Sequence, residues 1–112
     1  MAILNADYTN LNYETMAKEI GLKPKHMPML LESFLEEATP SLSAIAEAIS
    51  SNDLTTLASQ AHAIKGSAGN LRLNEVYEMT KDMELSAKEN DVSFDYTAHL
   101  DAVKVAIATI SI

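Results

Sequence analysis

Residues 53–71 read DLTTLASQAHAIKGSAGNL, and this stretch decides the fold. Its apolar side chains recur every three or four residues, which is the spacing of one face of an amphipathic α-helix. The residues of this stripe are Leu54, Leu57, Ala58, Ala61, Ile64, Ala68 and Leu71. Ser51-Asn52-Asp53 precedes the stripe and supplies a strong N-cap signal. The stretch therefore predicts a helix that buries one face against other helices.

Two helices are predicted before this one. A short helix covers residues 12–20, with Asn12 as its N-cap and Gly21 just beyond its end. A turn at residues 23–26 then leads to a longer helix, which carries apolar residues at helical spacing over about 28–49.

Two prolines mark the longer helix. Pro28 suits its first turn, because the backbone N–H that proline lacks would form no helical bond there. Pro40 lies inside the apolar pattern, where a proline removes a hydrogen bond and clashes with the preceding turn. We therefore expect Pro40 to kink the helix or to break it in two.

Two more helices are predicted after residue 71. The pair Leu73-Asn74 is the expected cap of the first, which should end near Asn90. Ser93 should open the second, which continues through Ile110. Apolar residues also alternate near the end of this last segment, as they do in a strand, but its length and alanine content favour a helix.

Together these elements predict an all-α protein, an antiparallel four-helix bundle with a short extra N-terminal helix. The length of 112 residues favours a single domain. Within it, residues 1–11 form an N-terminal extension and residues 12–112 the helical bundle.

Composition restricts the kinds of partner. Apolar residues make up 47% of the chain and the net charge is -8, so we expect a folded protein that does not bind nucleic acid. The absence of cysteine excludes disulfides and thiolate chemistry. The N-terminus has no secretory pattern, and no apolar run approaches the roughly 18 to 20 residues that span a bilayer. We expect a cytoplasmic monomer that does not enter a membrane.

His62 lies on the polar flank of the stripe and is surrounded by small residues. Gly66 and Gly69 follow along the same flank, and Ser59 and Thr55 lie one and two turns back. Each glycine inside a helix costs about 1 kcal/mol relative to alanine. Access of another molecule's backbone or phosphate to the imidazole explains this choice, so we assign these four small residues to partner binding.

A count across the predicted hairpin brings three charged residues to His62. With the turn centred between residues 72 and 73, position 83 is level with His62, and Glu84 beside it lies on the polar edge of its helix. A carboxylate there can accept a hydrogen bond from one ring nitrogen and leave the other as a nucleophile. Lys65 and Lys88 lie one turn from His62 and Glu84, and either ammonium can steady phosphoryl oxygens.

The stretch AHAIKGSAGNL, residues 61–71, resembles the signature of histidine-phosphotransfer domains, roughly A-H-x-x-K-G-S-A-x-x-L/G. The segment FLEE, residues 34–37, is similar to the second helix of that family. Family members commonly continue with glycine where this chain has Arg72. This departure concerns the tightness of the following turn, and it leaves the chemistry unaffected.

The resemblance implies specific roles. His62 would carry a phosphoryl group on Nε2, Lys65 would stabilise that group, Gly66 would leave room for the partner, and Glu84 would hold Nδ1. The donor would be a sensor histidine kinase or the phosphoaspartate of a receiver domain, and the acceptor a receiver aspartate of a response regulator. Mg²⁺ would belong to the receiver, and the chain would need no cofactor or metal of its own.

Other readings concern the same residues. A kinase would need a nucleotide-binding fold, and the chain has no P-loop and no kinase glycine-rich loop, so we expect a phosphocarrier and not an enzyme. An adaptor that docks a receiver or kinase without carrying phosphate is the alternative, and it would tolerate loss of His62.

Two of the site residues also have plainer structural interpretations. Glu84 could simply pair in solvent with Lys81 or Lys88. Lys65 could simply extend over the edge of the core.

The remaining histidines and the methionines have plainer interpretations. His26 and His99 are expected at the surface or half-buried, without a role. Four methionines are expected to fill the core, and these are Met27, Met29, Met79 and Met83.

Overall fold

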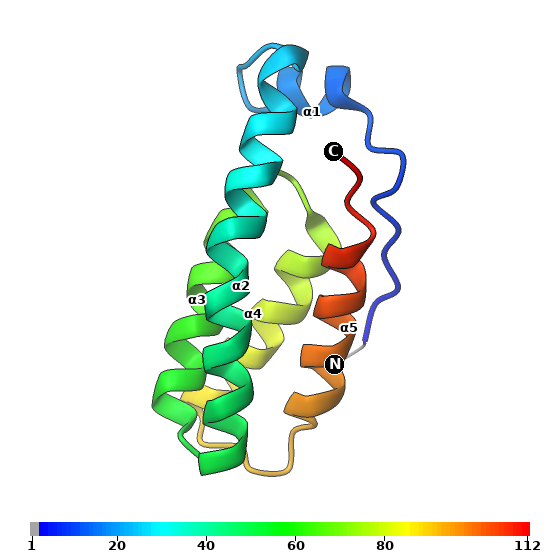
Figure 1. Ribbon diagram of the computed structural model, residues 1–112. Helices are drawn as coiled ribbons and strands as arrows, with labels where there is room; N and C mark the ends of the chain where they lie inside the picture. Colours follow the sequence, from blue (N-terminus) through cyan, green and yellow to red (C-terminus); the bar gives the residue numbers. More distant parts are fainter. Residues whose placement is uncertain (1–2) are drawn as a thin grey trace.

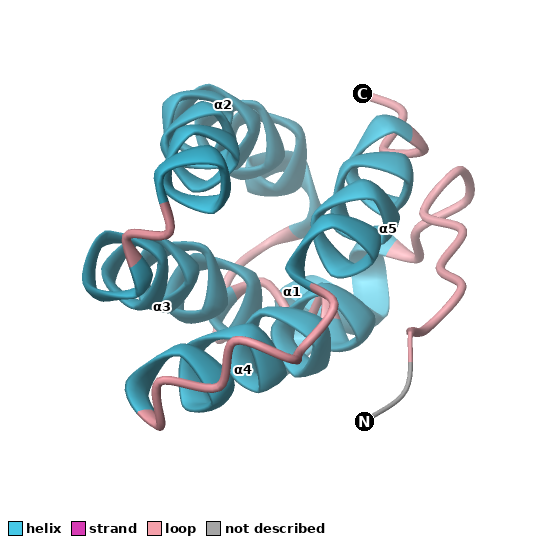
Figure 2. Ribbon diagram, turned by 90° about the horizontal axis from the view of Figure 1, so that it is seen from below, coloured by secondary structure: helices cyan, strands magenta, loops and turns pink. Residues whose placement is uncertain are grey.

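The computed structural model describes residues 3–112, so the first two residues of the predicted extension lie outside the described part. The described chain is helical throughout its regular structure, and four long helices form an antiparallel bundle with a short helix at one end (Figures 1 and 2). This confirms the predicted fold class. The elements are α1 (Tyr13–Glu19), the 3₁₀ turn η1 (Pro24–His26), α2 (Met27–Ser51), α3 (Leu54–Asn70), α4 (Asn74–Lys88) and α5 (Tyr96–Ala108).

The core lies between the four long helices. The stripe that predicted α3 faces inward, and all its members except the half-buried Leu54 are buried. The most extensive contact is that of α3 with α4, followed by that of α3 with α2. The hairpin of α3 and α4 is therefore a rigid base for any side chain on its outer face. No helix within residues 3–112 is long and apolar enough to cross a membrane.

The first two helices begin where the sequence predicts. The Asn12 side chain accepts a hydrogen bond from the Thr15 backbone N–H at 3.1 Å, and Gly21 follows α1 with φ +74°. Pro28 lies in the first turn of α2. These caps satisfy backbone groups that a helix end leaves without a partner.

The predicted break at Pro40 is wrong. Helix α2 runs without interruption through this residue (Figure 1). Pro40 lies on the exposed face of the helix, where water can bind the carbonyl that loses its backbone partner. Because Ala38 and Ile45 on either side are buried in the same core, packing outweighs the local cost of the proline.

The turn between α3 and α4 is tight although it contains Arg72 where a glycine was expected. Arg72 adopts φ 60°, a left-handed conformation. The Leu73 N–H donates to the Ala68 carbonyl at 2.9 Å, and the Arg72 N–H donates to the Gly69 carbonyl at 3.2 Å. This is the Schellman pattern that closes a helix end. The register of the hairpin is thus the one that a glycine would give.

The N-terminus of α4 is capped from a distant part of the chain. Leu73 holds the N-cap position and α4 begins at Asn74, as predicted, but no side chain of this pair forms a capping hydrogen bond. The Val76 N–H instead donates to the hydroxyl of Tyr8 at 3.3 Å, and that hydroxyl donates to Glu75 at 3.0 Å. Tyr8 is buried, and burial raises the pKa of its hydroxyl. The N-terminal segment thereby closes the start of α4.

The last helix begins two residues later than predicted. Asp95 is its N-cap and accepts from the Ala98 N–H at 3.0 Å. Ser93 lies in the preceding turn, where the Asp91 carboxylate accepts from both its N–H and its hydroxyl. Val103 and Ile107 are buried whereas Val105 is 66% exposed. This is the pattern of a helix, so the preference for helix over strand is confirmed.

Candidate functional site

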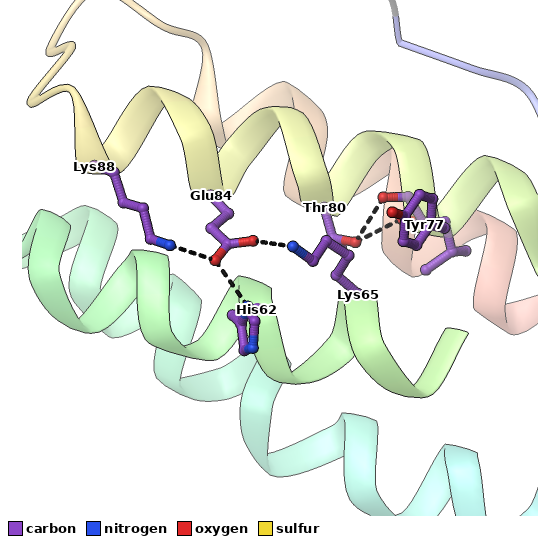
Figure 3. A network of polar contacts seen from close by, with 7 residues as sticks. His62, Lys65, Tyr77, Thr80, Glu84 and Lys88 are labelled. Atoms are coloured by element: carbon purple, nitrogen blue, oxygen red, sulfur yellow. Dashed lines mark hydrogen bonds and ion pairs between the residues drawn. The ribbon is translucent and has the colours of Figure 1, made fainter. Parts of the chain in front are cut away.

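Glu84 on α4 is the centre of a polar network on the outer face of the α3–α4 hairpin (Figure 3). Its side chain is only 2% exposed. Oε2 accepts a hydrogen bond from His62 Nδ1 at 2.8 Å, and the Lys88 ammonium lies 2.9 Å from the same oxygen. The Lys65 ammonium lies 2.6 Å from Oε1. The structure thus brings together the four residues that the sequence assigned to the chemistry.

The burial of Glu84 differs from the sequence-based expectation. The hairpin count places this residue level with His62, and the two are in contact, but it also places Glu84 on the polar edge of its helix. In the structure the carboxylate lies between the two helices, where two ammonium groups and one ring N–H surround it. Such partners compensate the loss of hydration that makes a buried charge costly.

The environment of Glu84 keeps it ionised at neutral pH. Burial raises its pKa, but hydrogen bonds from Lys65, Lys88 and His62 lower it more, and the net result is a pKa of about 2, down from 4.5. An ionised carboxylate can only accept hydrogen bonds. Therefore, when the His62 ring is neutral, its proton lies on Nδ1 and Nε2 carries the free lone pair.

His62 itself is open to solvent. Its side chain is 65% exposed, and Nδ1 is the ring nitrogen that contacts Glu84 (Figure 3). An exposed imidazole whose tautomer is fixed by a buried carboxylate can act as a nucleophile through its outer nitrogen. The site therefore holds Nδ1 and leaves the second ring nitrogen outside the contact with Glu84.

The two glycines beside His62 have different surroundings. Gly66 is exposed, and a β-carbon at this position would meet no atom within 4 Å. A β-carbon at Gly69 would lie 3.1 Å from Cδ2 of the Tyr77 ring on α4. Packing within the chain thus explains Gly69, whereas Gly66 leaves the surface next to the site bare. Partner binding stays a prediction for both.

The surface near the site has two separate hollows. An open groove of about 590 Å³ runs from His62, Glu84 and Lys88 toward the start of α3, and the exposed residues Thr55 and Ser59 line it. A separate depression is lined by Lys65, both helical glycines, Tyr77 and residues 70, 72 and 74 at the end of the hairpin. The two lysines of the network therefore border different hollows.

The structure also shows where the methionines and the two other histidines lie. Met27, Met79 and Met83 are buried as predicted, but Met29 is exposed, so the prediction for Met29 is wrong. The prediction for His99 is also wrong, because α5 is apolar on several faces and buries this ring against Phe94. His26 is half-buried as expected, and its Nδ1 accepts from the Lys23 N–H at 3.4 Å.

The ion pair of Lys65 with Glu84 was the least expected part of the site, whereas pairing of Glu84 with Lys88 was one of the alternatives that the sequence left open. The sequence assigned both ammonium groups to phosphoryl oxygens, but in the structure both contact the carboxylate. One signal was available, because Glu84 and Lys88 are four residues apart on one helix and this order favours pairing. The pairing of Lys65 across the hairpin had no local signal.

The family model of the Hpt domain matches residues 29–108. The chain therefore belongs to the histidine-phosphotransfer family, whose helical bundles are phosphocarriers of two-component systems and interact with kinases and receiver domains. The match includes every residue of the network around Glu84 and leaves α1, η1 and the N-terminal segment outside. No curated protein and no solved structure matches the chain significantly.

Proposed function

We propose that the chain is a phosphorelay intermediate that carries a phosphoryl group on Nε2 of His62. The observation that supports this most directly is the contact of the exposed His62 ring with the buried, ionised Glu84. It holds Nδ1 as a donor and leaves Nε2 as the outward nucleophile. Phosphoryl transfer depends mainly on positioning and electrostatics, and the network supplies both next to this atom.

The proposed partners are a sensor histidine kinase or phosphorylated receiver as donor and the receiver domain of a response regulator as acceptor. In the exchange with a receiver, the Nε2 lone pair attacks phosphorus, the bond from phosphorus to the aspartate oxygen breaks, and the carboxylate leaves with that electron pair. The reverse step regenerates the neutral imidazole. The chain offers few ammonium groups near this atom for a developing phosphoryl charge, so the receiver and its Mg²⁺ supply the rest.

The exposed surface around the ring supports docking of such a partner. Gly66, Ser59 and Thr55 present little side-chain bulk beside His62. A receiver must bring its aspartate within bonding distance of Nε2, and small neighbours allow this close approach. We therefore include these residues, with the half-buried Gly69, in the proposed partner surface.

The test is labelling with a panel of phosphorylated receiver domains and sensor kinases. Wild-type protein should acquire acid-labile, alkali-stable phosphate, and His62→Gln should acquire none. His26→Gln is the matched control, because it removes an imidazole from the η1 turn and should be labelled at the wild-type rate. Labelling of His62→Gln at the normal rate would exclude the proposal. A complex that forms without any label on the wild type would favour the adaptor function instead.

A further inference from the structure

The two lysines of the network are bound to Glu84 in different ways. Lys88 shares Oε2 with His62 Nδ1, whereas Lys65 is the cation at Oε1. Oε1 is fully buried. If Lys88 moves away, Oε2 keeps the hydrogen bond from the ring. If Lys65 moves away, a buried charged oxygen loses its cation, which is far more costly.

The exposure of the two side chains differs in the same direction. Lys65 is 22% exposed and Lys88 is 60% exposed. An exposed lysine on a flexible stem exchanges partners readily, because water replaces each contact it gives up. Lys88 also lines the groove that contains His62, whereas Lys65 borders the separate depression.

From these contacts we propose that Lys88 is the cation that leaves Glu84 and binds the phosphoryl group on His62, while Lys65 remains on Glu84 as a positioning residue. This inference rests on the proposed function. A phosphoryl group adds a charge of about -1.5 to -2 beside an existing carboxylate. Transfer of Lys88 neutralises part of the new charge, and Glu84 keeps one ammonium and the Nδ1 proton. The assignment differs from the role that the family resemblance implies for Lys65.

The test compares the two lysines in protein phosphorylated without a partner. The full chain is treated with phosphoramidate, a small phosphoryl donor, and the second ionisation of the phosphohistidine is followed by ³¹P NMR against pH. A nearby ammonium favours the dianion, so its loss raises the midpoint. Lys88→Gln should raise the midpoint by about 0.5 pH unit, and Lys65→Gln by less than half as much. Lys88→Arg, which keeps the charge, should return it to the wild-type value.

A control variant and a second measurement distinguish the loss of a positive charge anywhere on α4 from its loss beside His62. Lys81→Gln removes the same charge from α4 outside the network and should leave the midpoint unchanged. In unphosphorylated protein, ¹⁵N NMR of the imidazole should show an altered tautomer ratio in Lys65→Gln and a nearly unaltered one in Lys88→Gln. A midpoint shift in Lys65→Gln equal to or larger than that in Lys88→Gln would overturn the assignment, and His62 would still be the carrier.

The experiment also distinguishes failure of the proposed relay function from failure of the lysine assignment. If phosphoramidate labels His62 with the expected lysine ranking but no receiver or kinase exchanges phosphate with it, the relay function is wrong and the ranking stands. If phosphoramidate leaves His62 unlabelled, both proposals are overturned together.

Discussion

Gly66 and Gly69 lie on the same helix and cost it the same intrinsic stability, so their surroundings decide what alanine does at each position. Gly66→Ala places a β-carbon in open space and should stabilise the protein by up to about 1 kcal/mol. That corresponds to a rise of roughly 4 °C in the melting temperature of a domain of this size. Gly69→Ala should gain less or lose stability, because its β-carbon lies 3.1 Å from the Tyr77 ring.

Thermal unfolding of the two variants, followed by circular dichroism, measures this difference directly. Equal gains would mean that the Tyr77 ring moves aside without cost. A larger side chain at Gly66, such as glutamine, should leave the melting temperature high while it slows phosphoryl exchange with a receiver.

Arg72 is a residue in a conformation that suits glycine. Its φ of 60° costs a residue with a β-carbon about 1 kcal/mol. Its guanidinium donates to the Gly69 carbonyl at 2.9 Å and lies 3.7 Å from Glu19. Arg72→Gly removes the strain and the contacts, whereas Arg72→Ala removes only the contacts. Arg72→Gly should therefore be more stable than Arg72→Ala by about 1 kcal/mol.

Urea unfolding of wild type and both Arg72 variants gives the comparison. Because exposed contacts of this kind contribute only a few tenths of a kcal/mol, Arg72→Gly should match or exceed the wild type. An Ala variant as stable as the Gly variant would show that the turn relaxes away from the left-handed conformation.

For the site residues, the sequence predicted that His62 and Glu84 lie in contact, but it did not predict that Glu84 is buried. The hairpin count found Glu84 opposite His62 because the length of a helix turn is fixed and the turn at residues 71–73 is tight. It missed the burial of Glu84, because compensation by Lys65 and Lys88 depends on side-chain paths across two helices. A helical wheel places the direction of each Cβ and carries no information about the far end of a lysine.

Among the elements, α4 depends most clearly on a distant residue. Its first turn has no side-chain cap of its own, and the hydroxyl of Tyr8 accepts from the Val76 N–H. Tyr8→Phe should therefore destabilise the protein by about 1 kcal/mol, within the range for loss of an N-cap. Hydrogen exchange of the Val76 amide should become faster, because its partner is lost.

Tyr13→Phe is the matched control for this prediction. The Tyr13 hydroxyl donates to the Ser111 carbonyl at 3.2 Å in an exposed position, so its loss should cost clearly less. Equal costs in urea unfolding, with no change in the Val76 amide, would show that the Tyr8 hydroxyl does not cap α4.

The order and number of helices were predictable because each helix has an apolar period and most have a local end signal, such as Asn12, Asp53 and Gly21. The wrong predictions lie where a long-range contact outweighs the local sequence signal. Packing of α2 on both sides of Pro40 overrides the proline, and Tyr8 caps α4 across 68 positions of sequence. Neither effect can be found in a window of one or two helical turns.

The whole molecule is an elongated bundle of 42 × 24 × 21 Å. The segment before α1 runs beside α5 (Figure 1), where the Tyr8 N–H donates to Thr109 at 2.8 Å. This packing had no periodic signal in the sequence. The candidate site lies on α3 and α4, which are the two helices that pack most closely against each other.

Acid should weaken this bundle partly through the site. The pKa of Glu84 is about 2 when folded, below its ordinary value of 4.5. A carboxyl group whose pKa is lower in the folded state stabilises the fold above its unfolded pKa, and this contribution is lost as the pH falls toward 2. The pKa shift sets an upper limit of about 3 kcal/mol on this contribution to the free energy of unfolding. The actual contribution is smaller, because His62 and Lys88 are largely exposed and solvent screens their interaction with Glu84.

The difference in unfolding free energy between wild type and Glu84→Gln isolates this contribution. Glutamine keeps the shape and an acceptor for Nδ1 but does not titrate, and groups that titrate in both proteins cancel. Among these are Asp7, Asp53 and Asp91, whose pKa values are lowered by hydrogen bonds from neighbouring hydroxyl and backbone N–H groups. The wild type should be the more stable at pH 6, and its advantage should shrink steadily from pH 5 to pH 2. Urea unfolding across this range measures it, and a constant difference would mean that Glu84 protonates alike in the folded and unfolded chain.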